Sequence, residues 1–397
     1  MSKNFIVVIV VMMVSHLGMA SSSCESGGRS WVEIDGSVTM ALRSNACHYW
    51  SWAKDHTDLL PEELLSYEAV VSGDPHHENF SHIFSGGNRV YVLNDFDDVG
   101  WGPVFLDILK FLGVSRSVVD DEDKLSTQTI VEKYIQGLKD WDVSYEDVAD
   151  GGKNIPKMLE EDYSVSEKKF AEDYLEKIDK AINGDDEFKE DTGLFPWSDL
   201  KAAQKDTFRV LQEEIFSLFL PEGYEVLDRA NVVKLEGGGS AGLIRYLYYL
   251  KKKKKKQHIV EFKPISDPAV AIFNSDQAGP VERTQTAVDI YWPTASEDSG
   301  VYQVVGDDEN PFFMRPRHKK YVDYSVKDFK ENHQDFAELS YFIAYHLGQK
   351  HGGQLFQAGS LDAFLKVLEA DTTGLVEKSQ AFVAAYLDEA SSRHKKK

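Results

Sequence analysis

A glycine-rich segment between two apolar runs places the strongest limit on the fold. Gly237-Gly238-Gly239-Ser240-Ala241-Gly242 separates residues 226–234 from residues 243–250, and both flanking runs have strand-like composition. Gly237, Gly239 and Gly242 match G-x-G-x-x-G, a pattern whose bare backbone can approach an anion closely and donate N–H groups to it. A dinucleotide-binding motif of this spacing is followed by a helix. Because a strand-like run follows here, we predict a hairpin of an antiparallel sheet.

The remaining pattern combines strands with helices. Residues 259–263 are strand-like and follow a lysine-rich turn at residues 251–256, and residues 312–314 form another short apolar run. Apolar residues recur at helical spacing in the acidic stretch 120–225 and again over residues 327–349. This combination predicts the α+β class.

The charge balance excludes one class of partner. The formal net charge is −22, whereas binding to a phosphate backbone requires clustered lysine and arginine. The exceptions are the lysine run at residues 251–256 and the three terminal lysines, which we interpret as a solvated turn and a frayed tail. We therefore expect no nucleic-acid partner.

The N-terminus predicts an export signal. Lys3 supplies a positive charge, residues 5–14 are unbroken apolar sequence, and Gly18-Met19-Ala20 offers small residues for cleavage. The apolar run is too short to cross a bilayer comfortably, which favours a cleaved peptide over residues 1–20 above a retained anchor or a buried segment. We expect a secreted, periplasmic or secretory-lumen protein without a membrane span after cleavage.

The two cysteines leave two readings open. In an exported protein, Cys24 and Cys47 can form one disulfide bond. Two unpaired thiols are the alternative, and neither cysteine nor histidine spacing indicates a zinc site.

Two polar loops carry the residues that point to chemistry. The first, residues 72–79, contains Asp74, His76 and Asn79, and the second places Asp95 and Asp97 directly after an apolar strand. Phosphoryl transfer requires a carboxylate that orients the acceptor hydroxyl and hard oxygen ligands that hold Mg²⁺. We predict that Asp74 is the catalytic carboxylate and that the metal ligands come from Asn79, Asp95 and Asp97. The alternative reading is that these residues only stabilise turns.

Other residues complete the expected site. His76 belongs to the catalytic loop, where a hydrogen bond that stabilises the loop is favoured over direct acid–base chemistry. Lys263 ends the third strand and is expected to bind phosphates, the alternative being an ordinary strand-end lysine. Glu282 is expected to hold Lys263 in place, and Asp276 and Glu261 compete for this role. The glycine segment, through Gly237, Gly239, Ser240 and Gly242, is expected to bind the nucleotide.

The motifs resemble those of a known superfamily. Gly73-Asp74-x-His76-x-x-Asn79 and Asn94-Asp95-Phe96-Asp97 resemble the catalytic and metal loops of aminoglycoside phosphotransferases and protein kinases. In those enzymes the glycine loop, the lysine and the glutamate precede the catalytic loop, whereas here they follow it. The reversed order resembles a large, mostly bacterial family of uncharacterised kinase-like proteins. Pro264 departs from that family, in which an acidic residue is usual after the lysine, and residues 44–52 lack its common arginine, for which Arg43 is a possible substitute.

The resemblance implies a two-lobed protein-kinase-like fold, circularly permuted so that the catalytic-loop half precedes the glycine-loop half. Asp107 would anchor the catalytic loop by hydrogen bonds, and Arg315 and Arg317 would either bind phosphate or be surface charges. The expected divisions are a signal peptide (1–20), a linker (21–30), a large lobe with an acidic helical segment (31–225), a small nucleotide-gripping lobe (226–315) and C-terminal helices that pack on the large lobe (316–397).

The expected activity is ATP- and Mg²⁺-dependent transfer of phosphate to a hydroxyl of an unidentified protein or small molecule. Two alternatives stay open: a catalytically inactive kinase-like binding protein, and an enzyme that transfers AMP from the same cleft.

Overall fold

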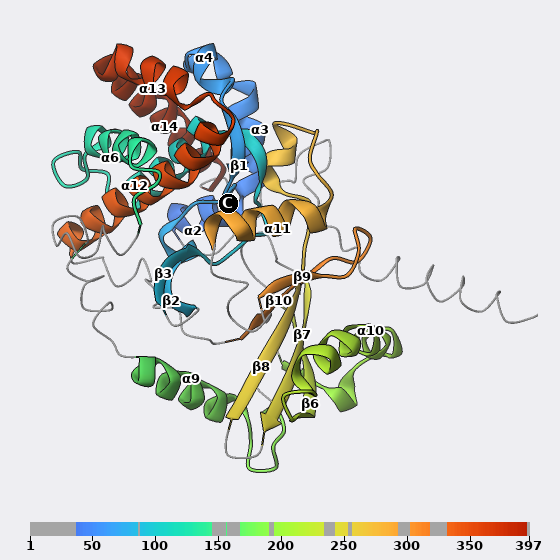
Figure 1. The fold of residues 1–397 in the computed structure, drawn as a ribbon. Coiled ribbons are helices and arrows are strands. Elements are labelled where there is room, and N and C mark those ends of the chain that lie inside the picture. The colour runs from blue at the N-terminus through green and yellow to red at the C-terminus, as the bar shows by residue number, and fades with distance from the viewer. Residues whose placement is uncertain are drawn as a thin grey trace, which may run out of the picture.

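The protein is a mixed α+β structure in which a group of helices lies beside a six-stranded antiparallel sheet (Figure 1). The computed structural model describes residues 37–85, 88–144, 156, 167–189, 194–233, 243–252, 256–292, 302–317 and 332–394. The glycine segment, the expected signal peptide and the expected linker lie outside these residues.

The six-stranded sheet has the order β5-β6-β7-β8-β10-β9, with every neighbouring pair antiparallel. Its strands are β5 (Leu194–Pro196), β6 (Tyr224–Val233), β7 (Ile244–Lys252), β8 (Lys256–Pro264), β9 (Gln303–Val305) and β10 (Phe312–Pro316). The two runs that flank the glycine segment are therefore antiparallel neighbours, as predicted, and the third run pairs with the second.

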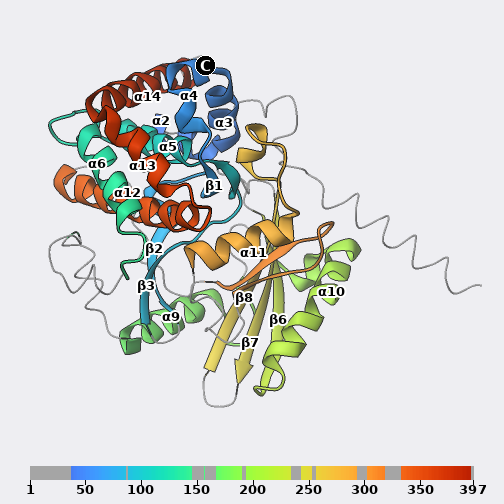
Figure 2. The ribbon, with the colours of Figure 1, turned by 45° about the horizontal axis from the view of Figure 1, so that its top comes forward.

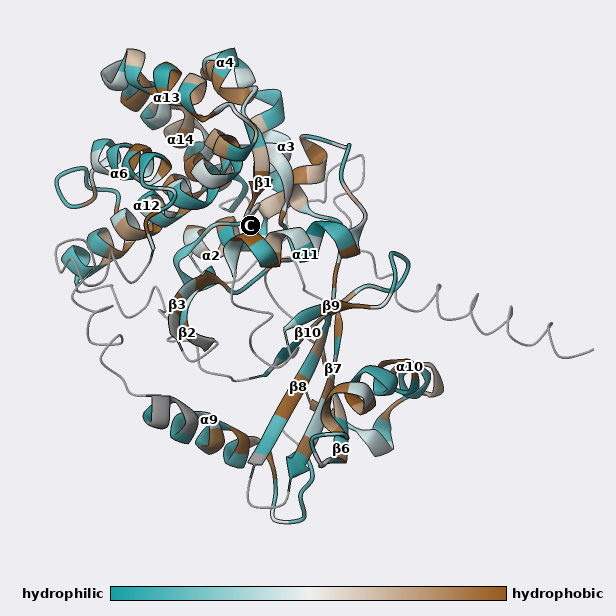
Figure 3. Ribbon diagram, in the orientation of Figure 1, coloured by the Kyte–Doolittle hydropathy of each residue, from teal (hydrophilic) through white to brown (hydrophobic). Residues whose placement is uncertain are grey.

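One helix packs against each face of this sheet, and both faces offer side chains for packing because alternate residues of a strand point to opposite sides. The helix α10 (Ala202–Phe219) packs Phe208, Leu211 and Ile215 on a face that includes Tyr248 and Phe262. The helix α9 (Glu167–Ala181) covers part of the other face. Both helices show alternating hydrophilic and hydrophobic bands in Figure 3, as expected for helices with one buried side.

The second face of the sheet divides into an apolar half and a charged half. Leu247, Tyr249 and Ile259 pack with residues of α9. Further along the same face, alternation places Glu261 and Lys263 on the side of Ile259. The charged half faces the helical part of the molecule, and it is where the candidate site forms.

The helical part is built around one large core. It comprises α2 (Val38–Ser44), α3 (Ala46–Asp55), α4 (Glu62–Leu65), α5 (Val104–Val118), α6 (Thr127–Lys139), α12 (His333–Gln357), α13 (Leu361–Ala370) and α14 (Thr372–His394). Two small antiparallel sheets join this part: β1 (Glu68–Val71) with β4 (Gly100–Pro103), and β2 (Phe80–Ser85) with β3 (Asn88–Leu93). The short 3₁₀ turns are η1 (Thr57–Leu59), η2 (His77–Asn79), η3 (Trp197–Asp199) and η4 (Ala269–Ile272).

The helix α11 (Pro280–Tyr291) lies between the helical part and the sheet (Figure 2). Its residues Ala287, Val288 and Tyr291 belong to the core of the helical part. Phe313, from strand β10, reaches the same core and stacks edge-on against Phe96. The sheet and the helices are thus joined by apolar contacts beside the loop that carries Asp95.

The packing assigns only part of the acidic segment to the expected neighbour, because α6 lies in the helical part whereas the later helices do not. We expected residues 31–225 to form one lobe with the catalytic loops. The described helices α9 and α10 instead pack on the six-stranded sheet. The expected helix over residues 327–349 corresponds to α12, whose buried face, like those of α13 and α14, belongs to the core of the helical part.

Two further expectations concern the N-terminal region. Cys47 is disulfide-bonded, while Cys24 lies outside the described residues. Within the part of the chain that the structure describes, no helix combines the length and the apolar character that crossing a membrane requires.

Candidate active site

The loop after β1 is held by the carboxylate of Asp107, which projects from α5. This carboxylate accepts hydrogen bonds from the backbone N–H of Ser72 at 3.1 Å and of Gly73 at 2.9 Å, and from the Ser72 hydroxyl at 3.0 Å. The expectation that Asp107 anchors this loop is confirmed. Gly73 has a left-handed φ of +74°, and a Cβ there would lie 1.8 Å from the carbonyl oxygen of Asp98. The position therefore requires glycine.

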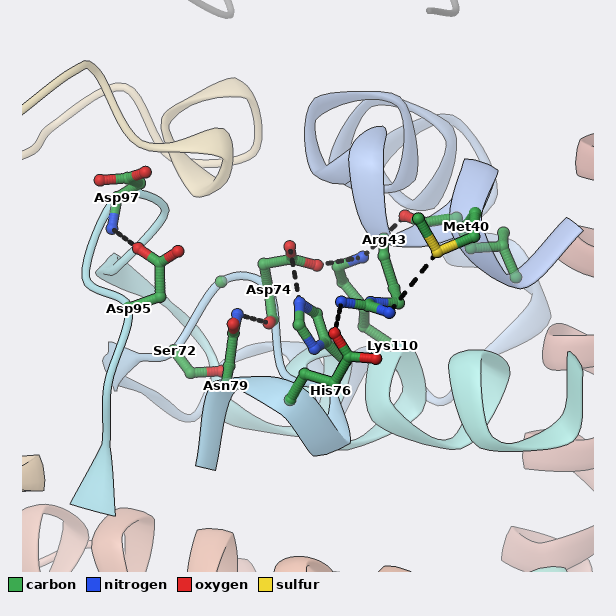
Figure 4. A network of polar contacts seen from close by, with 12 residues as sticks. Met40, Arg43, Ser72, Asp74, His76, Asn79, Asp95, Asp97 and Lys110 are labelled. Atoms are coloured by element: carbon green, nitrogen blue, oxygen red, sulfur yellow. Dashed lines mark hydrogen bonds and ion pairs between the residues drawn. The ribbon is translucent and has the colours of Figure 1, made fainter. Parts of the chain in front are cut away.

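Asp74 follows this turn, and its carboxylate is buried against a lysine (Figure 4). Its Oδ1 lies 2.8 Å from Nζ of Lys110, which is also buried and comes from α5. Burial raises the pKa of Asp74, and the charge of Lys110 and its hydrogen bond oppose that rise. In this environment the carboxylate of Asp74 accepts a proton more readily than it would in water.

His76 lies beside Asp74 but makes a weak contact with it. The distance from Nε2 to Oδ2 of Asp74 is 3.7 Å. Burial lowers the pKa of His76 well below its usual value, with Arg43 and Lys110 adding to the effect, so the ring is neutral at pH 7. The contact that stabilises the loop comes from its backbone, because the His76 carbonyl accepts a hydrogen bond from Asn79 N–H at 2.9 Å.

Asn79 is brought next to the second loop by the pairing of β2 with β3. Phe80 stands opposite Leu93, and the N–H of Asn94 donates to the carbonyl oxygen of Asn79 at 2.8 Å. The Asn79 side-chain amide donates to the carbonyl of Asp74 at 3.0 Å. Asn79 therefore connects the Asp74 loop with the residue that precedes Asp95.

Lys263 reaches this second loop from the sheet. Its ammonium lies 2.6 Å from Oδ1 of Asp95 and 2.7 Å from Oδ2 of Asp97. Burial on its own would raise the pKa of Asp95, but Lys263, followed by Arg315, lowers it well below its usual range. The pKa of Asp97 is raised, by burial first and then by the charge of Asp95. The two carboxylates therefore differ in how readily they ionise.

Glu282 is not brought to Lys263. Its side chain is exposed on the first turn of α11, and among the described residues the ion pairs of Lys263 are with Asp95 and Asp97. Glu261, a competing carboxylate two residues before Lys263, binds arginines instead. Arg315 contacts its Oε1 at 2.9 Å and Arg245 its Oε2 at 3.5 Å.

The structure thus gathers Asp74, His76, Asn79, Asp95, Asp97 and Lys263 from the predicted set. Gly237, Gly239, Ser240 and Gly242 lie outside the described residues. No role was predicted for Lys110, although its position carries a signal. Lys110 follows Asp107 by three residues on one helix, and this spacing places both side chains on the same helical face, toward the loop that Asp107 anchors.

The oxygen donors suit a magnesium ion. Mg²⁺ binds through one or two carboxylates and otherwise through waters and substrate phosphates. Asp95 and Asp97 supply two carboxylates, and among the described residues Oδ1 of Asn79 receives no hydrogen bond, since only its Nδ2 is engaged. No group of three or more histidine, cysteine or acidic side chains with the geometry of a metal site occurs in the described ranges. A metal ion at this position would accordingly also need Oδ1 of Asn79 and oxygens from waters or from a bound phosphate.

Comparison with known proteins identifies a family of uncharacterised proteins. No curated protein and no solved structure matches the chain significantly. Residues 43–396 match the family described as "Uncharacterized protein conserved in bacteria (DUF2252)". This match includes both polar loops and all strands of the six-stranded sheet. The chain belongs to the DUF2252 family.

Proposed function

We propose that the protein is an ATP- and Mg²⁺-dependent phosphotransferase that acts on a hydroxyl acceptor. The fold is proposed to be a circularly permuted version of the protein-kinase-like fold, with the catalytic loop early in the chain and the glycine hairpin late.

The observation that carries the proposal is the pair of contacts from Lys263 to Asp95 and Asp97. Lys263 and Asp95 are 168 residues apart in the sequence, yet their side chains are 2.6 Å apart. A lysine at the end of a sheet strand beside carboxylates that could hold Mg²⁺ is a recurring combination in phosphoryl-transfer sites. The nearby Asp74 provides a carboxylate, held separately, for the acceptor.

Each residue takes a role that suits its surroundings. Lys263 would exchange its carboxylate partners for phosphate oxygens, and Asn79, Asp95 and Asp97 would hold Mg²⁺. The bound ion would supply positive charge that neutralises the phosphate oxygens. Asp74 would orient the acceptor hydroxyl and accept its proton, while the acceptor oxygen bonds to the γ-phosphorus and the bond from that phosphorus to the bridging oxygen of ADP breaks.

Lys110 would keep Asp74 in position. Its ammonium holds one carboxylate oxygen of Asp74 at 2.8 Å, which leaves the other oxygen to face the acceptor. The neutral ring of His76 lies near that second oxygen, at 3.7 Å. His76 would thus help to enclose Asp74 rather than carry charge.

Nucleotide binding to the full-length protein tests this proposal. Mg²⁺ and ATP are expected to raise the melting temperature of the wild type, and Lys263→Ala should remove this increase. Lys251→Ala is the matched control, because Lys251 lies on neighbouring β7 and pairs with Asp186 away from the polar loops. No stabilisation of the wild type by any nucleotide would overturn the proposal.

A product measurement separates the proposal from its two alternatives. The wild type is incubated with Mg²⁺, ATP and candidate proteins or small alcohols, and the products are identified by mass spectrometry. A phosphate adduct supports phosphoryl transfer, whereas an AMP adduct identifies adenylyl transfer. Nucleotide binding with neither adduct nor ADP release identifies an inactive binding protein.

A further inference from the structure

Three arginines surround one glutamate on the charged half of the sheet. Glu261 belongs to β8, and Arg315 stands opposite it in the register of β10. Arg245, on β7, is one position beyond the Tyr246–Phe262 pair, which places it beside Lys263. Arg317 follows two residues after Arg315, and its N–H donates to the carbonyl of Ile259 at 2.7 Å. Alternation along the strands puts these side chains on one face.

Two of the arginines contact the glutamate directly. Arg315 donates from Nε to Oε1 of Glu261 at 2.9 Å, and its Nη2 forms an ion pair with the same oxygen at 2.9 Å. Hydrogen bonds between charged groups of this kind are stronger than those between neutral groups. Arg245 adds a longer contact of 3.5 Å to the other oxygen. Glu261 is consequently ionised, since the arginines outweigh its burial and hold its pKa well below the usual range.

Glu261 forms ion pairs with Arg315 and Arg245, and these pairs do not explain why Arg317 lies in the same cluster. Nη1 of Arg317 is buried and has no hydrogen-bond acceptor among the described residues. Burial lowers the pKa of Arg317, and Arg245 and Arg315 repel its charge, although Glu261 attracts it. Burying a charged group without a full set of partners costs free energy. The nearby carboxylates of Asp95 and Asp97 are paired with Lys263 and not with Arg317.

The cluster also touches the proposed active site. Nη1 of Arg315 donates to the backbone carbonyl of Asn94 at 2.9 Å, and Asn94 directly precedes Asp95. An anion on Arg245, Arg315 and Arg317 would therefore lie beside the nucleotide and metal residues, yet on different side chains from Lys263.

We propose that Arg245, Arg315 and Arg317 form a phosphate-binding subsite, separate from Lys263, in which the anion supplies the acceptor that Nη1 of Arg317 lacks among the described residues. A guanidinium group can pair with either a carboxylate or a phosphate. A phosphate group has more negative charge and more acceptor oxygens than a carboxylate, so it suits a cluster of three arginines better. The phosphate belongs either to the chain of the nucleotide or to the acceptor. A role of this subsite in phosphoryl transfer rests on the proposed function, whereas binding of the anion does not.

The test uses inorganic tripolyphosphate with the full-length protein, in the absence of nucleotide and metal, measured by isothermal titration calorimetry. All variants are made in the Lys263→Ala background. Lys263, the proposed phosphate-binding residue of the active site, then does not contribute to the measured affinity. Arg317→Met and Arg245→Met are each expected to weaken binding by roughly tenfold or more, the usual effect of removing one charge-assisted hydrogen bond. Arg317→Lys, which keeps the charge but loses the fork, replaces Arg317→Met if the latter fails to fold.

Arg229→Met is the matched control. Arg229 is a part-buried arginine of the same sheet, but it faces α10, where it donates to Gln212 and lies over Trp197. Its removal should leave tripolyphosphate affinity unchanged. Equal affinities of all variants, or no binding to the Lys263→Ala background, would overturn the subsite whether or not the wild type binds ATP.

Two further titrations identify the source of the phosphate. If it belongs to the nucleotide, Arg317→Met weakens Mg²⁺·ATP binding but not AMP binding. If it belongs to the acceptor, Arg317→Met leaves Mg²⁺·ATP affinity unchanged, and inorganic phosphate binds to wild type already saturated with a non-hydrolysable ATP analogue. A protein that binds tripolyphosphate through these arginines but fails to bind ATP would support the subsite and contradict the proposed function.

Discussion

The ammonium of Lys110 lies 2.8 Å from Oδ1 of Asp74, and both side chains are buried where α5 meets the loop after β1. Lys110 also lies over the ring of Tyr49, at 5.3 Å from its centroid. Asp74, the proposed proton acceptor, is therefore held in place by a buried cation. Several consequences of this arrangement can be measured.

Replacing Lys110 by methionine should destabilise the protein and shift its pH dependence. Removing one partner of a buried pair leaves the other charge unpaired, at a cost of about 3–5 kcal/mol. Because Lys110 opposes the effect of burial on Asp74, its loss should raise the pKa of Asp74 further and move the acidic limb of the rate profile to higher pH. Chemical denaturation and a pH–rate profile measure the two effects. Lys124→Met, at an exposed ion pair with Asp121, is the control and should change neither.

Replacing Asp74 by asparagine should remove transfer while keeping nucleotide binding. The amide preserves the size of the side chain but cannot accept the acceptor's proton, and general-base catalysis typically contributes about 10²–10⁴-fold to the rate. Single-turnover measurement of ADP formation in the presence of acceptor, paired with a thermal-shift titration, separates chemistry from binding. Full activity of this variant would contradict the role of Asp74.

Replacing Gly73 by alanine should strongly destabilise the folded state. The left-handed backbone costs about 1–2 kcal/mol for a residue with a side chain. The added Cβ would also lie 1.8 Å from Asp98 O, and overpacking of this kind adds about 1–3 kcal/mol. Equilibrium denaturation measures the sum.

Gly359→Ala provides the control for this substitution. Gly359 has a similar φ of +72°, but nothing lies within 4 Å of a Cβ built there. Its replacement should cost only the backbone component, about 1–2 kcal/mol. Equal losses at the two glycines would show that the Gly73 turn can move away from Asp98.

The buried histidines should make stability fall as the solution is acidified. Burial, with a smaller contribution from Arg43, lowers the pKa of His77 from 6.5 to about 3, and its Nε2 contacts the Ser340 hydroxyl at 2.8 Å. Between these two pKa values the unfolded state binds a proton that the folded state does not. Each pH unit below 6.5 therefore removes about 1.4 kcal/mol of stability for this residue, until the folded pKa is reached.

His77→Gln tests this sign, because glutamine does not titrate. The variant should show a shallower loss of unfolding free energy between pH 6.5 and pH 4 than the wild type, measured by urea denaturation at several pH values. Parallel curves for the two proteins would contradict the assignment.

The polar loops and the strands were predictable because their signals are local. Asp74, Asn79 and Asp95 stand at spacings that identify loops, and residues 226–234 and 243–250 have the composition of strands. The partner of Lys263 was not predictable, because two carboxylates from a loop 168 residues away in sequence compete with the nearby Glu282. The neighbours of α9 and α10 were likewise hidden, since an amphipathic helix reveals that it packs but not against which surface.

Lys110 shows a different limit. Its position in the sequence places Lys110 on the same face of α5 as Asp107. Lysine side chains are rarely buried, however, so the usual expectation is that Lys110 is exposed to solvent. Only the tertiary arrangement shows that Asp74 supplies the opposite charge.

The bridge made by Arg315 bears on how a ligand would enter. Arg315 holds Glu261 on its own sheet and the carbonyl of Asn94 in the helical part, next to the salt bridges from Lys263 to Asp95 and Asp97. Separating the two parts therefore requires these contacts to break as a group. Association of the proposed ligand at these residues would accordingly exchange one set of ionic partners for another. Its rate should increase with moderate salt before screening of the ligand's own charge slows it again.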